Sequence, residues 1–273
     1  MDNSAQIEYW NSAGSQAWVD EQVHMDAQLE PLSALAVTAA AAQPGERVID
    51  IGCGCGATSL SLADSGAQVW GVDVSAPMLA LARQRASGRD NLVFSEADAA
   101  VQHYTADHDL VFSRFGVMFF ADPIAAFTNI KTALNEDGRL VFICWRAPRE
   151  NPWMSVVGRE VQPLLPQIGP PPEPRMPGPF AFAEQAWLEE ILATAGFRAV
   201  QIDAVDETLR LGADLDEALY YLSKIGPLAR GLGDLDEARR QHALSVARAA
   251  LEPYQRDQGV MLGAGCWLVQ ARA

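Results

Sequence analysis

The stretch Val48–Thr58, VIDIGCGCGAT, places a glycine-rich turn directly after a short apolar run. The run is typical of a buried strand, and glycines at Gly52, Gly54 and Gly56 leave no Cβ to keep a ligand away from the backbone. If a helix follows, its first N–H groups point at the ligand, as in many phosphate-binding turns. Asp50 is out of place for a phosphate, because a carboxylate repels an anion and attracts a cation. The stretch therefore predicts a site for a ligand that carries positive charge.

Segments typical of strands and of helices alternate around this turn. Strands are expected at residues 47–51, 68–73, 91–94, 109–113, 139–145, 197–205 and 259–271. Helices are expected at residues 57–63, 75–81, 122–134 and 184–195, with a turn at 135–138. Such alternation predicts an α/β fold, a doubly wound Rossmann-like sheet that is mostly parallel and has about seven strands.

Three segments fall outside this alternation and are expected to cover the sheet. Residues 1–45 form an N-terminal helical cover, in which Pro31 opens an alanine-rich helix. Within the main domain, residues 46–273, the proline-rich segment 146–182 and the helical segment 207–256 are cap insertions. A link of that length between the last two strands far exceeds an ordinary connection.

Composition excludes several classes of partner. The 273 residues carry a net charge of −15, which would be repelled by nucleic acid and by an anionic membrane surface. No apolar run is long enough to span a bilayer, and the start, MDNSAQIEYW, lacks the pattern of a signal peptide. The four cysteines suggest neither a disulfide framework nor a metal site. We therefore expect a cytoplasmic protein without a metal; the sequence does not predict its oligomeric state.

The glycine pattern leaves a second interpretation open. Gly52-x-Gly54-x-x-Ala57 also fits a loose dinucleotide fingerprint, and Asp73 stands about 20 residues on, where a ribose-binding acid is expected. A nicotinamide enzyme is therefore an alternative. Asp50 argues against it, because a carboxylate at the end of the first strand would repel a pyrophosphate.

Five stretches, taken in order, resemble the class I S-adenosylmethionine-dependent methyltransferases, in the branch similar to quinone-biosynthesis and small-molecule methyltransferases. They are VIDIGCGCGATSL (48–60), VWGVDVSAPML (69–79), FSEADA (94–99), DLVFSRFGVMFF (109–120) and LNEDGRLVFICW (134–145). The resemblance implies a Rossmann-like sheet with an antiparallel last strand and S-adenosyl-L-methionine as cofactor.

The resemblance also assigns residues to that cofactor. Asp50 would lie near the methionine ammonium, Asp73 would take both ribose hydroxyls, and Asp98 would accept from the adenine amino group. For Asp98 the alternative of a helix cap stays open. The full set implied is Asp50, Gly52, Cys53, Gly54, Gly56, Asp73, Val74, Met78, Asp98, Ala99, Ser113 and Arg114, with Tyr9 and Trp10 from the cover.

The function implied is methyl transfer to a small-molecule acceptor by in-line displacement. The alternatives are an NAD(P)-dependent oxidoreductase and a protein that binds adenosylmethionine without catalysis. No catalytic residue is assigned; the candidates for a general base are His24, Tyr104 and Arg114. Aromatic residues outside the matched core could line an acceptor pocket: Trp145, Trp153, Phe180, Phe182 and Tyr220.

Overall fold

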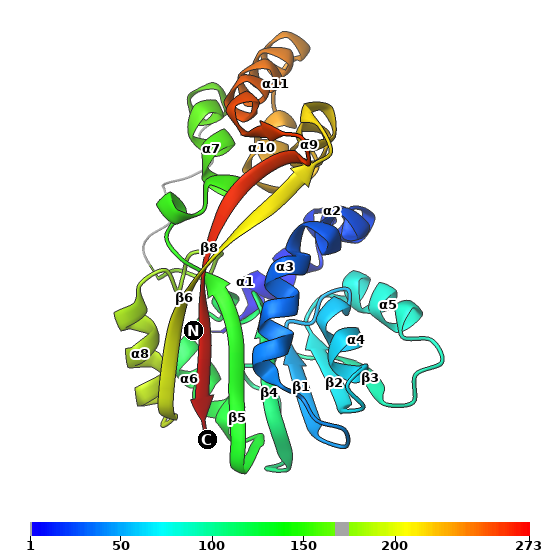
Figure 1. The fold of residues 1–273 in the computed structure, drawn as a ribbon, viewed down its shortest axis with the longest axis vertical. Coiled ribbons are helices and arrows are strands. Elements are labelled where there is room, and N and C mark those ends of the chain that lie inside the picture. The colour runs from blue at the N-terminus through cyan, green and yellow to red at the C-terminus, as the bar shows by residue number, and fades with distance from the viewer. Residues whose placement is uncertain (1, 167–174) are drawn as a thin grey trace.

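The computed structural model describes residues 2–166 and 175–273. The prolines at 170–172 and 174, which belong to the predicted proline-rich cap segment, lie outside the described residues. One mixed sheet runs through the molecule in the order β3-β2-β1-β4-β5-β8-β6 (Figure 1). Its strands are β1 (Arg47–Ile51), β2 (Gln68–Asp73), β3 (Leu92–Glu96), β4 (His108–Arg114), β5 (Leu134–Trp145), β6 (Arg198–Gly212), the short β7 (Gln255–Arg256) and β8 (Gly259–Arg272). The first five strands pair in parallel, whereas β8 runs antiparallel to both β5 and β6. The predicted doubly wound sheet with an antiparallel last strand is confirmed.

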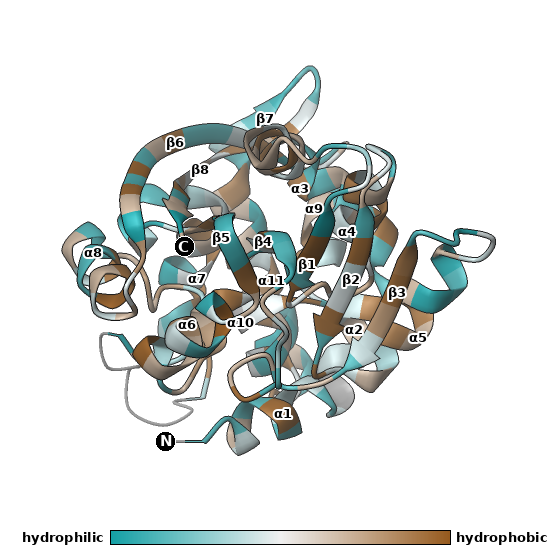
Figure 2. Ribbon diagram, turned by 90° about the horizontal axis from the view of Figure 1, so that it is seen from below, coloured by the Kyte–Doolittle hydropathy of each residue, from teal (hydrophilic) through white to brown (hydrophobic). Residues whose placement is uncertain are grey.

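Helices cover both faces of this sheet. Those of the body are α4 (Ala57–Ala63), α5 (Ala76–Arg85), α6 (Pro123–Lys131) and α8 (Gln185–Thr194). Helices α4 and α5 join parallel neighbouring strands, while α6 and α8 pack together on the opposite face. Seen from below, the strands β1 and β3 are mostly apolar and lie among the helices (Figure 2). No helix in the described part has the length and apolar composition that a bilayer crossing requires.

The N-terminal segment is helical, as predicted, but its helices divide differently. It forms α1 (Ser4–Trp10), α2 (Ala13–Asp20) and α3 (Gln22–Ala40). The prediction that Pro31 opens a helix is wrong, because Pro31 lies in the middle of α3. The buried face of α3, which includes Leu29, Leu32 and Ala36, packs against the core. The free energy gained by burying this face outweighs the loss of the backbone hydrogen bond that a proline removes.

The predicted turn at residues 135–138 is instead part of β5. The register with β4 passes from His108↔Leu134 directly to Leu110↔Arg139, so the turn-like residues form an irregularity inside the strand. Asn135 Nδ2 donates to Asp109 Oδ1 at 2.8 Å, which holds that irregularity against β4. The preceding helix, α6, accordingly ends at Lys131, earlier than the predicted Leu134.

The strand β6 is longer than predicted and reaches Gly212, which pairs with Val260 of β8. The first residues of the expected helical segment 207–256 therefore belong to a hairpin arm. The helices α9 (Leu215–Leu222), α10 (Gly226–Leu232) and α11 (Glu237–Leu251) follow that arm. Together with α7 (Pro152–Val161) they sit at the far end of β6 and β8, at the top of Figure 1.

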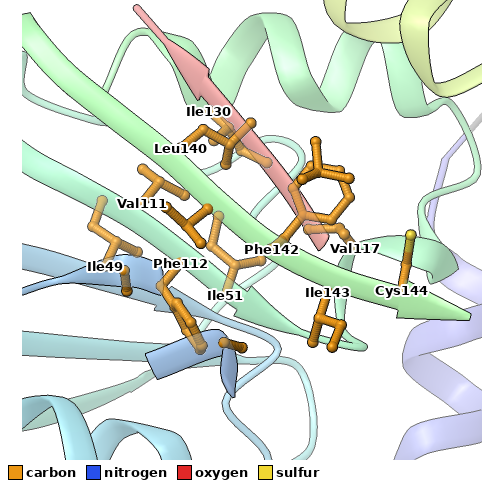
Figure 3. Packing of buried hydrophobic residues seen from close by; sticks show 14 of the residues in the cluster. Ile49, Ile51, Val111, Phe112, Val117, Ile130, Leu140, Phe142, Ile143 and Cys144 are labelled. Carbon is orange, nitrogen blue, oxygen red and sulfur yellow. The ribbon is translucent and has the colours of Figure 1, made fainter. Parts of the chain in front are cut away.

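Two hydrophobic clusters fill the interior. The larger lies between the sheet and its helices, where Phe112, Phe142 and Ile49 are buried (Figure 3). The smaller joins α7, α9, α10 and α11 to the ends of β6 and β8, and includes Val157, Leu251 and Val260 among its buried members. The chain segments 152–161 and 215–251, far apart in sequence, thus share a second core.

The side chain of Phe127 is the centre of the large cluster on the α6 side. It is 0% exposed and lies 5.5 Å from Phe142 and 6.2 Å from Phe182 between ring centroids. We expect Phe127→Ala to lower the free energy of unfolding by about 3–5 kcal/mol, the usual cost of an aromatic-sized cavity. Urea denaturation followed by tryptophan fluorescence measures it. Val101→Ala, at a side chain 78% exposed, is the control and should change that free energy by less than about 0.5 kcal/mol.

Candidate active site

The carboxyl ends of β1 and β4 approach each other so closely that only glycine fits between them. A Cβ on Gly52 would lie 2.6 Å from Gly116 Cα, and a Cβ on Gly116 would lie 2.6 Å from the Ile51 carbonyl oxygen. The buried hydroxyl of Ser113 donates to that carbonyl at 2.8 Å and accepts from the Gly116 N–H at 3.2 Å. Ser113 thus joins the two strand ends, and its proton is already used in the backbone contact.

The glycine turn between β1 and α4 is held at several points. Gly54 and Gly56 have φ values of 53° and 81°, which favour glycine. The Gly54 N–H donates to Asp73 Oδ2 at 2.7 Å, and the Gly56 N–H donates to the Cys53 carbonyl at 2.9 Å. Among the described residues, the Gly54 carbonyl and the Cys55 N–H have no hydrogen-bond partner. One peptide of the turn therefore keeps both its polar groups available to a ligand.

Asp50 is a buried carboxylate with one unused oxygen. It is 0% exposed, and its Oδ2 accepts from Thr58 Oγ1 at 2.8 Å and from Ser59 Oγ at 2.6 Å. Its Oδ1 is buried and has no partner among the described residues. Burial raises the pKa of Asp50 to about 6, against the opposing effect of the two hydroxyl donors and of Arg114. A buried, unpartnered carboxylate oxygen is costly, and a cationic ligand would relieve that cost.

Arg114, at the end of β4, is a cation whose charge acts on this carboxylate. Its Nη1 donates to Ser33 Oγ of α3 at 2.8 Å, and within the described part it has no ion pair. Burial lowers the pKa of Arg114, and the charges of Asp26 and Asp50 oppose that change. A half-buried guanidinium bound only by a neutral hydroxyl suits an anionic ligand group. Asp50 and Arg114 together suit a zwitterion.

Asp73 ends β2 on the other side of the turn. Its Oδ1 accepts from the Ser75 N–H at 2.8 Å, and its Oδ2 accepts from Gly54. Burial raises the pKa of Asp73, while these backbone bonds act against the rise. Each oxygen keeps a further lone pair, so the carboxylate can still accept from two hydroxyls. Met78, which is buried, lies under the turn, its Sδ 3.7 Å from where a Gly54 Cβ would be.

Asp98 follows β3 and caps a turn, not a helix. Its Oδ1 accepts from the Ala100 N–H at 2.9 Å, and Val101 N–H donates back to the Asp98 carbonyl. The neighbouring Ala99 is buried and its carbonyl accepts from the Tyr104 hydroxyl at 3.1 Å. The helix-cap interpretation of Asp98 is therefore wrong, because the residues after it form a turn. One of its carboxylate oxygens remains outside the bonds found in the described residues.

Two asparagines, which the sequence analysis missed, attach the N-terminal segment to this edge. Asn3 Nδ2 donates to Asp98 Oδ1 at 2.8 Å, and Asn3 Oδ1 accepts from the Ala121 N–H at 2.8 Å. Asn11 Nδ2 donates to the Val74 carbonyl at 2.8 Å, and its Oδ1 accepts from the Ala76 N–H at 3.0 Å. No sequence signal distinguished these amides, because their partners lie 63 to 118 residues away.

The aromatic residues Tyr9 and Trp10 of α1 contact different parts of the molecule. Trp10 lies edge-to-face against Phe119, with ring centroids 5.2 Å apart. Tyr9 is 39% exposed, and its hydroxyl accepts from Arg230 of α10 at 3.3 Å. Helix α1 thus contacts both the segment after β4 and the helix α10.

The predicted aromatic pocket is only partly assembled. The ring centroids of Trp145 and Trp153 are 5.0 Å apart. Phe182, however, is buried in the main core, and Tyr220 is 56% exposed beside Lys224. Phe182 and Tyr220 are therefore wrong as pocket residues, because one packs on α6 and the other faces solvent.

Phe115 joins the aromatic cluster of Trp145 and Trp153. Its ring stacks on Trp145 at 3.9 Å and 5° between planes. Its φ of 62° is strained for a residue with a side chain, a feature that sequence does not reveal.

Two of the three candidate bases, His24 and Tyr104, are engaged in contacts with backbone carbonyls. His24 Nε2 is 2.8 Å from the Leu211 carbonyl, and its ring stacks on Tyr221 with 4.0 Å between ring centroids, so it joins α3 to β6 and α9. Burial raises the pKa of Tyr104, whose hydroxyl is bound to Ala99. Among the residues that the structure describes, no group of three His, Cys, Asp or Glu is arranged to hold a metal.

Comparison with known proteins agrees with this geometry. The profile of the family described as "Methyltransferase domain" matches residues 49–142. The chain is 34% identical over 105 residues to a demethylmenaquinone methyltransferase of Clavibacter sepedonicus, covering 38% of this chain and 43% of that protein. It is 32% identical over 155 residues to the aklanonic acid methyltransferase DauC of Streptomyces sp. strain C5, covering 53% of this chain and 69% of that protein.

Solved structures support the fold. The YcgJ protein of Bacillus subtilis superposes with a TM-score of 0.57 at 20% identity, covering 88% of this chain and 97% of that one. A phosphoethanolamine N-methyltransferase of Haemonchus contortus in complex with S-adenosyl-L-methionine gives a TM-score of 0.55 at 19% identity, covering 89% of this chain and 52% of that one.

The matched family segment begins within β1 and ends within β5, so it contains the glycine turn, Asp50, Asp73 and Arg114. The identity to DauC extends over more than two thirds of that protein. The chain belongs to the methyltransferase-domain family, that of the class I S-adenosylmethionine-dependent methyltransferases.

Proposed function

We propose that the protein transfers a methyl group from S-adenosyl-L-methionine to a small-molecule acceptor. One observation carries the proposal: beside the glycine turn, a buried carboxylate oxygen of Asp50 and the guanidinium of Arg114 both lack an ionic partner in the described part. An amino-acid zwitterion satisfies both groups at once, whereas a pyrophosphate would face Asp50. The cofactor, when bound, supplies an electrophilic methyl group on a sulfonium.

The residues of the turn hold the methionine part. The Asp50 carboxylate accepts hydrogen bonds from the methionine ammonium, and the Arg114 guanidinium donates to the methionine carboxylate. The Cys55 N–H, which has no partner in the described residues, also donates to the methionine part. The backbones of Gly52, Cys53, Gly54 and Gly56 form the floor, and Ser113 fixes their distance from β4.

The loops after β2 and β3 hold the nucleoside. Asp73 accepts from both ribose hydroxyls, and Val74 and Met78 flank the adenine. Asp98 and the Ala99 backbone bind the adenine edge. Tyr9 and Trp10 close the site from the N-terminal segment, which Asn3 and Asn11 anchor.

The chain's contribution to methyl transfer is alignment and exclusion of water. The stacked rings of Phe115 and Trp145 form an apolar wall where β4 and β5 end. An acceptor held there in line with the methyl group gains from orientation alone about 7–11 kcal/mol. An amine or an activated carbon needs no general base, which agrees with the occupied state of His24 and Tyr104.

We propose that the acceptor is a small molecule bound to the methyltransferase domain, residues 46–273. Two insertions of this domain, the segments 146–182 and 207–256, form a cap over the acceptor. The N-terminal segment 1–45 is a separate helical cover. The second core, which joins α7 to α11, supports one cap. The names of the relatives include methyltransferases of aklanonic acid and demethylmenaquinone, both small molecules. The net charge of −15 argues against nucleic acid, and we propose a cytoplasmic location.

A protein that binds the cofactor without catalysis is the remaining alternative, while family membership disfavours a nicotinamide enzyme. We expect mass spectrometry of the purified protein to find adenosylmethionine or adenosylhomocysteine. Incubation with labelled adenosylmethionine and a panel of phenols, hydroquinones and amines should release adenosylhomocysteine. Binding of NADH in preference to adenosylhomocysteine would contradict the proposal.

Asp73→Ala tests the ribose contact. Losing an acceptor for two hydroxyls should weaken adenosylhomocysteine binding about 10- to 100-fold, measured by isothermal titration calorimetry. The matched control is Asp64→Ala, an acid with a side chain 63% exposed and paired with Arg89 outside the site. Equal affinity of Asp73→Ala and the wild type would show the ribose assignment to be wrong.

The raised pKa of Asp50 predicts a pH dependence of binding. A protonated Asp50 has no charge to offer an ammonium, so affinity for adenosylhomocysteine should fall below pH 6, by up to about tenfold per pH unit. The fold itself does not suffer, because a carboxyl whose folded-state pKa is raised stabilises the folded state as pH falls.

The control for this experiment is 5′-methylthioadenosine, which lacks the ammonium but meets Asp73, whose pKa is also raised. The affinity for adenosylhomocysteine divided by the affinity for 5′-methylthioadenosine therefore reports the effect of Asp50 alone. It should decline between pH 7 and pH 5 in the wild type and stay constant in Asp50→Asn. A constant ratio in the wild type would remove Asp50 from the ammonium site.

A further inference from the structure

Arg85, at the last turn of α5, links the glycine turn to the N-terminal cover. Its Nη1 donates to the Cys55 carbonyl at 2.7 Å, and its Nη2 pairs with Asp26 Oδ2 of α3 at 2.7 Å. Both side chains of the pair are mostly shielded, at 24% and 27% exposure. Gln22 Nε2 also donates to Asp26 Oδ2, so Asp26 is held from its own helix.

The position of the Cys55 carbonyl gives this contact its importance. The peptide between Cys53 and Gly54 is bound at both ends, by Gly56 N–H and by Asp73. The peptide between Cys55 and Gly56 is also bound at both ends, by Arg85 and by the Cys53 carbonyl. Between them lies the peptide whose carbonyl and N–H have no partner in the described residues. The bond from Gly56 N–H to the Cys53 carbonyl closes both flanking peptides, so Arg85 provides one of the three hydrogen bonds that set the orientation of the free N–H.

We propose that Arg85 is a positioning residue for the cofactor, with Asp26 as the residue that orients it. Arg85 fixes the plane of the peptide after Cys55, and through it the direction of the Cys55 N–H that meets the methionine part. Glycine on both sides of Cys55 makes this plane easy to rotate, which is why an outside donor is needed. This inference rests on the proposed function and adds two residues to its site.

The second link runs through α3. Asp26 on one turn of this helix holds Arg85, and Ser33 two turns later binds Arg114. Both arginines next to the glycine turn are therefore oriented by the same helix. The cover helix α3 thereby sets the geometry of the methionine half of the site, although none of its residues is assigned to touch the cofactor.

Calorimetric titration of the full chain with adenosylhomocysteine and with 5′-methylthioadenosine tests the proposal. Arg85→Met keeps the length of the side chain and removes its donors. We expect it to weaken adenosylhomocysteine binding about tenfold or more and methylthioadenosine binding by less than about threefold, because only the first ligand has the amino-acid part. Arg85→Lys restores a charged donor and should recover at least half of the loss on a logarithmic scale.

Arg83→Met is the matched control. Arg83 lies on the same helix and also donates to a backbone carbonyl, that of Phe94, at 3.3 Å. It should leave both affinities within about twofold of the wild type. Asp26→Asn, which keeps the size of the side chain and removes its charge, should weaken adenosylhomocysteine binding in the same sense as Arg85→Met and provides a second test if that variant does not fold.

The outcomes separate the two proposals. If the wild type binds neither ligand, the proposed function fails. If the wild type binds both and Arg85→Met binds adenosylhomocysteine equally well, the positioning role is overturned. Equal weakening for the two ligands, or no recovery in Arg85→Lys, also overturns it, because loss of packing alone would produce that result.

Discussion

The contact between the backbones of Gly52 and Gly116 is the constraint around which the site is built. Both residues lack a Cβ, and a Cβ on either would come within 2.6 Å of the other strand end. The hydroxyl of Ser113 bonds across the same gap, so β1 and β4 end at one fixed separation. The groups that we assign to the methionine part of the cofactor lie at or beside these two strand ends, and the bond from Gly54 N–H to Asp73 joins the glycine turn to the end of β2.

The buried charges follow from that arrangement. Asp50 lies in β1, two residues before Gly52, and is fully buried, so its carboxylate can be tolerated only with donors nearby. Thr58 and Ser59 of α4 satisfy one oxygen, while the other is left unbonded in the described structure. Arg114 carries the opposite charge and forms no ion pair with any residue that the structure describes. The fold thus retains two incompletely satisfied charges that are costly for stability and useful for binding, a combination found where function outweighs stability.

The segments outside the sheet act on the site by tertiary contact. Asn3 and Asn11 bind loops after β2, β3 and β4, while Asp26 and Ser33 of α3 hold the two arginines beside the glycine turn. On its other side, α3 meets the cap through His24 and Gln28, whose Oε1 accepts from the Tyr221 hydroxyl at 2.7 Å. One helix therefore holds both arginines beside the turn and contacts the proposed cap, which gives the cofactor half and the proposed acceptor half a common support.

Sequence alone determined the order of strands and helices in the body, the glycine turn and the acids at the ends of β1 and β2. These features depend on local chemistry, namely apolar runs, glycine spacing and residues next to one another in the chain. The predicted turn at 135–138 and the start of the helical segment at 207 were wrong, because pairing with β4 and β8 overrode the local preference for turn or helix. Asn3, Asn11, Arg85 and Phe115 were missed for a related reason. Their roles arise from partners brought near by folding, or from a backbone angle, and neither leaves a pattern along the chain. Only the tertiary structure could show that, in the described part of the chain, Asp50 keeps an unbonded oxygen and Arg114 has no ion pair. Both facts depend on which groups surround these side chains, and residues far apart in the sequence provide those surroundings.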